Sequence, residues 1–192
     1  MKKAEIIKYL KGQYKAKKVD SDWEFILKDD DEGYLAFFPG TFGTGSTRTL
    51  LGMPSMTLPW LLKLYRPIFY PDKKATPTFV AGPQFKLPAR EGVIYKEQID
   101  ELVERCFEWF QQQSQQEVVA TEFARCYEKI TGFPPAGWQP KHIMACVLKG
   151  DVDRLRGYLD AFKRGDRMEF IPIIKQEYFE RAIPLAEKYR SG

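Results

Sequence analysis

The fold of the chain is decided by residues 23–38, which read WEFILKDDDEGYLAFF. In WEFIL every second side chain is large and apolar, which places the Trp, Phe and Leu on one side of a strand. The acidic run 29–32 followed by Gly33 has the composition of a tight turn. YLAFF then supplies an apolar partner strand. We therefore predict an antiparallel strand pair here.

The segments on either side of this strand pair differ in character. Residues 2–15 have the apolar spacing of a helix, and residues 17–22 read as a polar connection. Eight of the 13 prolines fall in residues 39–90, which predicts short or edge strands joined by proline turns. The alternative for residues 59–65 is one or two helical turns with Pro59 near the first position.

From residue 92 onward the apolar spacing becomes helical. Ile99, Leu102 and Cys106 belong to one stripe of a long predicted helix, and similar stripes follow it. Pro140 is expected to open a helix, and Gly150-Asp151 to end one helix and cap the next. A last helix is expected over residues 175–189, kinked or split by Pro184.

These patterns predict an α+β fold, with an N-terminal helix and an antiparallel β-sheet followed by a C-terminal helical bundle. A length of 192 residues suits a single domain, 1–192, with sub-regions 1–90 and 91–192. The net charge of +4 is uneven. Residues 1–90 carry 15 basic and 9 acidic residues, net +6, whereas residues 91–192 carry 15 and 17, net −2.

The composition also predicts a compartment. No apolar run is long enough to span a membrane, and the start resembles no signal peptide. Cys106, Cys126 and Cys146 make an odd count, which argues against a disulfide framework. We therefore expect a cytoplasmic protein without a membrane partner.

The glycine-rich stretch Gly40–Thr49 is the first candidate site. Its backbone N–H groups, hydroxyls and Arg48 could hold a phosphate. No lysine follows the glycines as a P-loop requires, and the glycine order is not that of a dinucleotide site. The other interpretation is an exposed loop that contacts a partner.

Metal and cofactor sites are not expected. His142 and Cys146 are four residues apart and could face the same way, but they provide only two ligands. Cys106 and Cys126 lie within apolar stripes, where cysteine is a small core residue. The acidic turn 29–32 lacks the spacing of a calcium loop and is expected to be a solvated hairpin turn.

Two further segments have plain interpretations. The seven lysines between Lys2 and Lys18 could contact phosphates, but the acidic residues that follow oppose such a patch, so nucleic acid is not an expected partner. The run Gln111–Gln116 is expected to be a connector between helices. No catalytic motif such as G-x-S-x-G or H-E-x-x-H is present, so no catalytic residue is assigned and an enzyme is not expected.

A family resemblance points to a function. Residues 150–159 resemble the helix-pair junction of ankyrin repeats, but the T-P-L-H signature and a second copy are absent. The longer stretch through Phe162, Gly165-Asp166-Arg167, Phe170-Ile171-Pro172 and Tyr178-Phe179 resembles the C-terminal part of small bacterial immunity proteins. Those proteins neutralise toxins of type VI or contact-dependent secretion systems, and the resemblance covers roughly the last quarter of the chain.

The resemblance implies a non-catalytic protein that binds a cognate toxin directly and stoichiometrically. Such an inhibitor needs aromatic and arginine anchors on its surface. A net charge of +4 favours a non-nuclease toxin, or docking beside a nuclease site, because inhibitors that imitate nucleic acid are acidic. We expect contacts from residues 40–49 and 60–74, with these anchors: Arg48, Trp60, Tyr65, Arg66 and Tyr70. The alternatives are a phosphate-binding protein or enzyme using Gly40–Thr49, and a nucleic-acid binder using the N-terminal lysines.

Overall fold

The computed structural model describes residues 1–72, 80–133 and 135–191. Its contacts divide the chain into two compact units. The first unit is Met1–Pro59 with Thr76–Ser114, and the second unit is Trp60–Ala75 with Gln115–Gly192. The chain therefore passes from one unit to the other three times.

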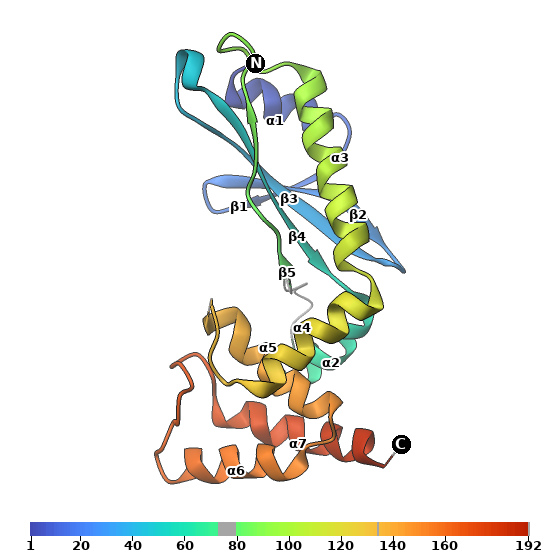
Figure 1. Ribbon diagram of the computed structural model, residues 1–192, viewed down its shortest axis with the longest axis vertical. Helices are drawn as coiled ribbons and strands as arrows, with labels where there is room; N and C mark the ends of the chain where they lie inside the picture. Colours follow the sequence, from blue (N-terminus) through green and yellow to red (C-terminus); the bar gives the residue numbers. More distant parts are fainter. Residues whose placement is uncertain (73–79, 134, 192) are drawn as a thin grey trace. The chain divides into compact units, whose positions relative to one another are not determined.

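The first unit combines two helices with a six-stranded antiparallel sheet (Figure 1). The strand order is β1-β2-β3-β4-β5, and β6 also pairs with β4. The predicted α+β class, with its N-terminal helix and antiparallel sheet, is confirmed. Its elements are α1 (Lys3–Lys11), β1 (Lys15–Val19), β2 (Asp22–Asp30), β3 (Gly33–Phe42), the short 3-10 helix η1 (Gly45–Thr47), β4 (Thr49–Thr57), β5 (Val80–Ala81), β6 (Phe85–Pro88) and α3 (Lys96–Gln113).

The second unit is helical, and it contains the predicted C-terminal run of helices together with α2 from the middle of the sequence. Within the described residues, no helix combines the length and the apolarity needed to cross a bilayer. The helices are α2 (Pro59–Phe69), α4 (Gln116–Glu128), α5 (Pro135–Leu148), α6 (Val152–Lys163) and α7 (Gln176–Arg190).

The predicted strand pair is confirmed as β2 and β3. Phe25 lies opposite Phe37, and their ring centroids are 5.9 Å apart. The Asp30 carboxylate accepts hydrogen bonds from the backbone N–H groups of Glu32 at 2.9 Å and Gly33 at 3.2 Å, which closes the turn. The acidic run is therefore a hairpin turn in which the Asp30 side chain satisfies two backbone N–H groups of the turn.

One face of the sheet forms the core of the first unit. The helices α1 and α3 contribute Ile6, Leu10, Ile99 and Leu102 to a cluster with β-sheet side chains such as Phe37. The approach of α3 to β4 is close, because a Cβ built on Gly52 would lie 2.8 Å from both Cδ atoms of Leu102. We call this side the core face of the sheet.

The expectation that prolines exclude long elements from residues 39–90 is wrong. The strand β3 runs through Pro39 and β4 runs through Pro54. The Pro54 carbonyl accepts a hydrogen bond from Gly82 N–H at 2.7 Å, and Gly82 lies between β5 and β6. Because the nitrogen and the carbonyl of a strand residue point to the same side, the missing N–H of Pro54 also faces this gap, where no strand needs it. Pro39 lies past the last β2–β3 pair, where no partner needs a donor.

Helix α2 confirms the alternative for residues 59–65, because it begins at Pro59, and it extends further than expected. Two other boundaries differ from the predictions. β1 forms within the expected polar connection, and α5 begins at Pro135 with Pro140 inside it. The last helix has nearly the expected bounds, and of the two outcomes expected at Pro184 it does not show the split. The connector at Gln111–Gln116 is confirmed, since α3 ends at Gln113 and α4 begins at Gln116.

The core of the second unit is aromatic. Phe170 and Phe179 are buried, with ring centroids 5.2 Å apart, and Phe162 and Tyr158 pack against both. The predicted junction between α5 and α6 is confirmed. Gly150 has a φ of 64°, and the Asp151 carboxylate accepts from the Arg154 N–H at 3.1 Å.

Candidate protein-binding surface

The second face of the sheet in the first unit carries apolar side chains as well. Directly paired residues of antiparallel strands point to the same face. Phe38 pairs with Met53, Gly40 with Leu51 and Phe42 with Thr49, on the face opposite to Phe37 and Gly52. We call this second face the open face, and its large apolar members on β2, β3 and β4 are Ile26, Phe38, Phe42, Leu51 and Met53.

The open face is accessible to solvent around Phe42 and Met53, whereas Ala36, Ser55 and Thr57 farther along the same face are buried. Phe42 is 73% exposed and Met53 is 47% exposed, whereas the core-face residue Phe37 is fully buried. Phe38 and Leu51 are half-buried. Both of the described helices of this unit contact the core face instead. An exposed group of large apolar side chains on a regular element is typical of a binding surface.

Lysines border the open face on its two outer strands. Lys15 pairs with Ile26 and Lys17 with Glu24 on the β1 side, while Lys86 pairs with Leu51 on the β6 side. All three lysines are exposed. None of them forms an ion pair with the part of the chain that the structure describes.

Carboxylates on the open face are placed differently. Glu24 is only 8% exposed. Tyr34 lies near it and near Asp29, and burial together with these two carboxylates raises the pKa of the Tyr34 hydroxyl. Asp29 pairs with Tyr34 next to the hairpin turn, at the opposite end of β3 from Phe42. The exposed carboxylate of Asp29 is therefore distant from Phe42, whereas Lys17 and Lys86 lie on the outer strands on either side of Phe38 and Leu51.

The predicted anchors fall in both units. Arg48 follows η1 in the first unit, where its carbonyl accepts from Ala89 N–H at 2.8 Å. The other four anchors lie in the second unit, on α2 or just after it. Residues 73 and 74 of the predicted contact segment lie outside the described residues.

The four anchors of the second unit are partly engaged in packing. Trp60 is 43% exposed, and its ring lies 6.0 Å from that of Phe123. The ring of Tyr65 lies 4.5 Å from that of Phe69 and 5.8 Å from that of Tyr70. Burial raises the pKa of Tyr65. Arg66 is half-buried, and its Nε has no hydrogen-bond partner among the described residues.

The glycine-rich loop forms a local turn. Gly43 and Gly45 have φ values of 76° and 53°, a region that favours glycine. The N–H groups of Thr47 and Arg48 donate to the carbonyls of Thr44 and Gly45, both at 3.2 Å. These two donors are therefore already used within the loop and do not point together at a phosphate.

His142 lies in the interior of the second unit. Its Nδ1 is 2.6 Å from the Cys126 carbonyl oxygen, and its Nε2 is 3.0 Å from the Tyr158 hydroxyl. The Cys146 sulfur is 3.7 Å from Nε2, and Arg154 Nε donates to the Tyr158 hydroxyl at 2.8 Å. This is a buried polar network within a helical core.

The three cysteines are buried as well. Burial raises the pKa of Cys106 and Cys146 to about 12, and that of Cys126 to about 11. Thiols with such pKa values are poor nucleophiles at neutral pH. Among the described residues, no group of three histidine, cysteine or carboxylate side chains could hold a metal ion.

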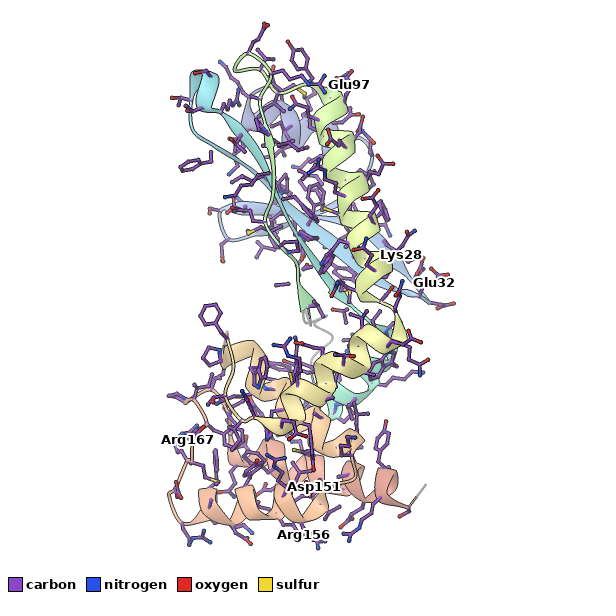
Figure 2. The ribbon with its side chains drawn as sticks, viewed as in Figure 1. Lys28, Glu32, Glu97, Asp151, Arg156 and Arg167 are labelled. Carbon is purple, nitrogen blue, oxygen red and sulfur yellow. The ribbon has the colours of Figure 1, made fainter. Side chains whose placement is uncertain are left out.

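Some of the remaining charged candidates form pairs within the first unit. Lys28 Nζ lies 2.8 Å from Asp30 and 2.7 Å from Glu32 in the hairpin turn (Figure 2). The hydrogen bond from Lys28 lowers the pKa of Asp30. Of the N-terminal lysines, Lys3 pairs with Asp22 at 2.9 Å, and Lys11 lies 3.1 Å from the centre of the Trp23 ring.

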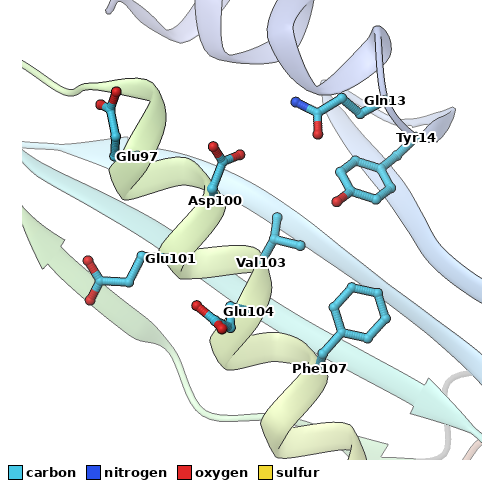
Figure 3. Close-up of a pocket in the computed structure, with 8 residues that line it drawn as sticks. All are labelled: Gln13, Tyr14, Glu97, Asp100, Glu101, Val103, Glu104 and Phe107. Atoms are coloured by element: carbon cyan, nitrogen blue, oxygen red, sulfur yellow. The ribbon is translucent and has the colours of Figure 1, made fainter.

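An acidic groove runs along α3 on the side of the sheet covered by helices. It has a volume of about 640 Å³, and Gln13 and Tyr14 face the helix across it (Figure 3). The Tyr9 hydroxyl donates to the Asp100 carboxylate at 2.9 Å, which raises the pKa of Tyr9. The α3 residues that line the groove are Glu97, Asp100, Glu101, Val103, Glu104 and Phe107.

The open face was missed in the sequence, although a signal for it exists. YLAFF and LLGM each place large apolar side chains at successive positions, so both faces of β3 and β4 are apolar. A strand with a single covered face shows alternation of apolar and polar residues instead. The prolines of residues 39–90 obscured this pattern because they suggested short elements.

The fold and this surface define a class, namely a two-unit α+β protein whose sheet leaves one apolar face exposed. The chain belongs to the family described as "Family of unknown function (DUF6990)", whose model matches residues 2–187. No curated protein and no solved structure matches the chain.

Proposed function

We propose that this protein is a non-catalytic protein-binding module, and that it serves as an immunity protein which neutralises a cognate bacterial toxin by direct stoichiometric contact in the cytoplasm. The observation that carries the proposal is the exposure of Phe42 and Met53 on the open face. Exposure of large apolar side chains to water is unfavourable, and a partner that covers them gains free energy of binding from their burial.

The chemistry of the interior supports binding rather than catalysis. His142 and the three cysteines are the side chains best suited to nucleophilic or acid–base work, and all four are buried. Burial lowers the pKa of His142 and raises the pKa values of the thiols, so each favours its neutral form. Cys106 belongs to the core of the first unit, and the other three residues belong to the core of the second unit.

The immunity role follows from the resemblance of the C-terminal quarter to small bacterial immunity proteins. A stoichiometric inhibitor needs a rigid surface with apolar anchors and no active site. A sheet provides such a surface, since its side chains are fixed by neighbouring strands. Trp60 on α2 is also exposed, and it is the most exposed of the five anchors expected from the sequence.

The test is co-purification of the tagged full-length protein from its native host, followed by toxicity assays with any stoichiometric partner. We expect a single protein that is encoded nearby, that halts growth when expressed alone, and that is neutralised by co-expression of this chain. Met53→Glu should abolish protection, because it places a charge in the apolar contact. Ile173→Glu is the matched control, since Ile173 is 55% exposed in the second unit.

The outcomes separate the candidate functions. Loss of protection with Met53→Glu and full protection with Ile173→Glu supports the proposal, provided that both variants keep the wild-type melting temperature. A partner whose toxicity is not relieved by this chain contradicts the immunity role. Co-purification of nucleic acid or of a phosphorylated small molecule, with no protein partner, contradicts the proposal altogether.

A further inference from the structure

We infer that the open face accepts a partner surface that is apolar at its centre and carries carboxylates at its margins. This inference rests on the proposed function, because it names the chemistry of the protein that would be bound. It is argued from the charges around the open face and from the side chains at its centre.

The lysines stand on opposite margins of the apolar residues. Lys15 and Lys17 belong to β1, at one edge of the sheet, and Lys86 belongs to β6, on the far side of β4. Leu51 and Met53 lie between these margins on β4. Within the described ranges the three ammonium groups have no ion-pair partner, so an incoming carboxylate would not have to displace one.

The carboxylates of the first unit lie mainly elsewhere. Glu97, Asp100, Glu101 and Glu104 lie along α3, the helix that covers the core face (Figure 3). On the open face itself, Glu24 is buried, and the exposed carboxylate of Asp29 lies next to the hairpin turn, away from Phe42. The first unit has 13 basic and 14 acidic residues, net −1, so the basic margins reflect segregation of charge and not an excess of it.

The central side chains favour a protein over a nucleic acid. Single-stranded nucleic acids are held by a basic groove that follows the phosphates together with stacking of bases on aromatic rings. Of the five large apolar residues on β2, β3 and β4, Ile26, Leu51 and Met53 are aliphatic and offer no ring for stacking, whereas Phe38 and Phe42 do. The aliphatic residues are suited to apolar side chains of a protein surface, whose rim would supply the carboxylates.

The test uses a photo-crosslinking amino acid, p-benzoylphenylalanine, at position 53 of the full-length protein in the native host, and at position 173 as the control. We expect crosslinks from position 53, and none from position 173, to the protein that co-purifies with the wild-type chain. The crosslinked segment should contain apolar residues flanked by an excess of Asp and Glu.

The charge argument is tested on the same purified partner. Lys15→Glu, Lys17→Glu and Lys86→Glu together should raise the dissociation constant about tenfold or more, and high salt should weaken wild-type binding. The matched control reverses three lysines of the second unit that have no ion-pair partner among the described residues, with a change of less than about twofold expected. These are Lys129, Lys163 and Lys175.

Failure of this inference differs from failure of the proposed function. A toxin that is neutralised by the chain but crosslinks only from position 173, or through a segment rich in Lys and Arg, overturns the inference and leaves the immunity role intact. Equal binding by the two triple variants also overturns it. The absence of any protein partner overturns both.

Discussion

At the scale of single residues, His142 is the side chain with the most constrained chemistry. Its Nδ1 faces the Cys126 carbonyl oxygen and must therefore carry the proton, so Nε2 is left to accept from the Tyr158 hydroxyl. The Tyr158 oxygen in turn accepts from Arg154. A second proton on His142 would have to enter between these groups and would place a cation near the Arg154 guanidinium.

This arrangement predicts acid sensitivity of the folded protein. Burial lowers the pKa of His142 in the folded state below its unfolded value, so protonation favours the unfolded state. The contribution of the neutral imidazole is fully present above the unfolded pKa of about 6.5 and is lost as the pH falls below it. The melting temperature should drop between about pH 7 and pH 5.

The control for this prediction is His142→Gln. This variant is expected to be less stable at neutral pH, since it disturbs the network, but its melting temperature should be nearly flat over the same pH range. A wild-type protein that shows the same flat profile would contradict the assignment of the acid-sensitive step to His142. Thermal unfolding followed by circular dichroism measures both.

At the scale of elements, the packing of α3 on β4 depends on Gly52. A Cβ at this position would lie 2.8–2.9 Å from three carbon atoms of Leu102, which is fully buried and has no room to move. Gly52→Ala should therefore lower the free energy of unfolding by about 1–3 kcal/mol. Urea denaturation measures this change.

Gly40 provides the matched control for Gly52. It lies on the neighbouring strand β3, and a Cβ there would meet only the Leu51 Cβ, at an ordinary distance of 3.8 Å. Gly40→Ala should be neutral or slightly stabilising, because it also restricts the unfolded chain. Equal destabilisation by the two variants would show that the loss comes from the strand backbone and not from the helix contact.

The elements that were predicted best from the sequence are those whose backbone hydrogen bonds are made by residues nearby in sequence. The turn after β2 and the Gly150-Asp151 junction are examples, because neighbouring residues satisfy their backbone groups. The strand β1 was missed because its lysines make it look like a linker, although Ala16 packs on the core. The strands β3 and β4 can run through Pro39 and Pro54 because the side of each proline that lacks an N–H does not face a paired strand. That depends on pairing between strands that are distant in sequence, which local patterns do not reveal.

The candidate surface could be predicted only in part. Arg48 and Trp60 were singled out for their residue types, and the structure gives Trp60 substantial exposure. The open face needed the strand register, since only the pairing of Phe38 with Met53 and of Gly40 with Leu51 brings these residues to one side. Register is fixed by tertiary contacts that a single sequence does not reveal.

At the scale of the whole molecule, the units do not coincide with the two halves of the sequence. Helix α3 contributes Ile99, Leu102, Val103 and Cys106 to the core of the first unit. A fragment of residues 1–90 lacks all four and should show no cooperative unfolding. A fragment of residues 1–114 contains the complete first unit and should retain a cooperative transition and a near-ultraviolet circular dichroism signal.

Both fragments contain α2 without its partners in the second unit, so Leu64→Gln and Ile68→Gln should be introduced into each to keep it in solution. These two residues are buried on α2 and belong to the second unit. A cooperative transition in the fragment of residues 1–90 would contradict the assignment of α3 to the core of the first unit.

The interleaving of the two units also has a consequence for synthesis on the ribosome. The sheet and α3 can assemble as soon as residue 114 has emerged, whereas α2 was made some forty-five residues earlier and finds its partners much later. The Arg181 guanidinium donates to the Ile68 carbonyl, and the ring of Tyr178 meets that of Phe69, across more than one hundred residues of chain. Until α7 is translated, the apolar side of α2 remains uncovered, and a nascent chain in this state is a natural client for a chaperone.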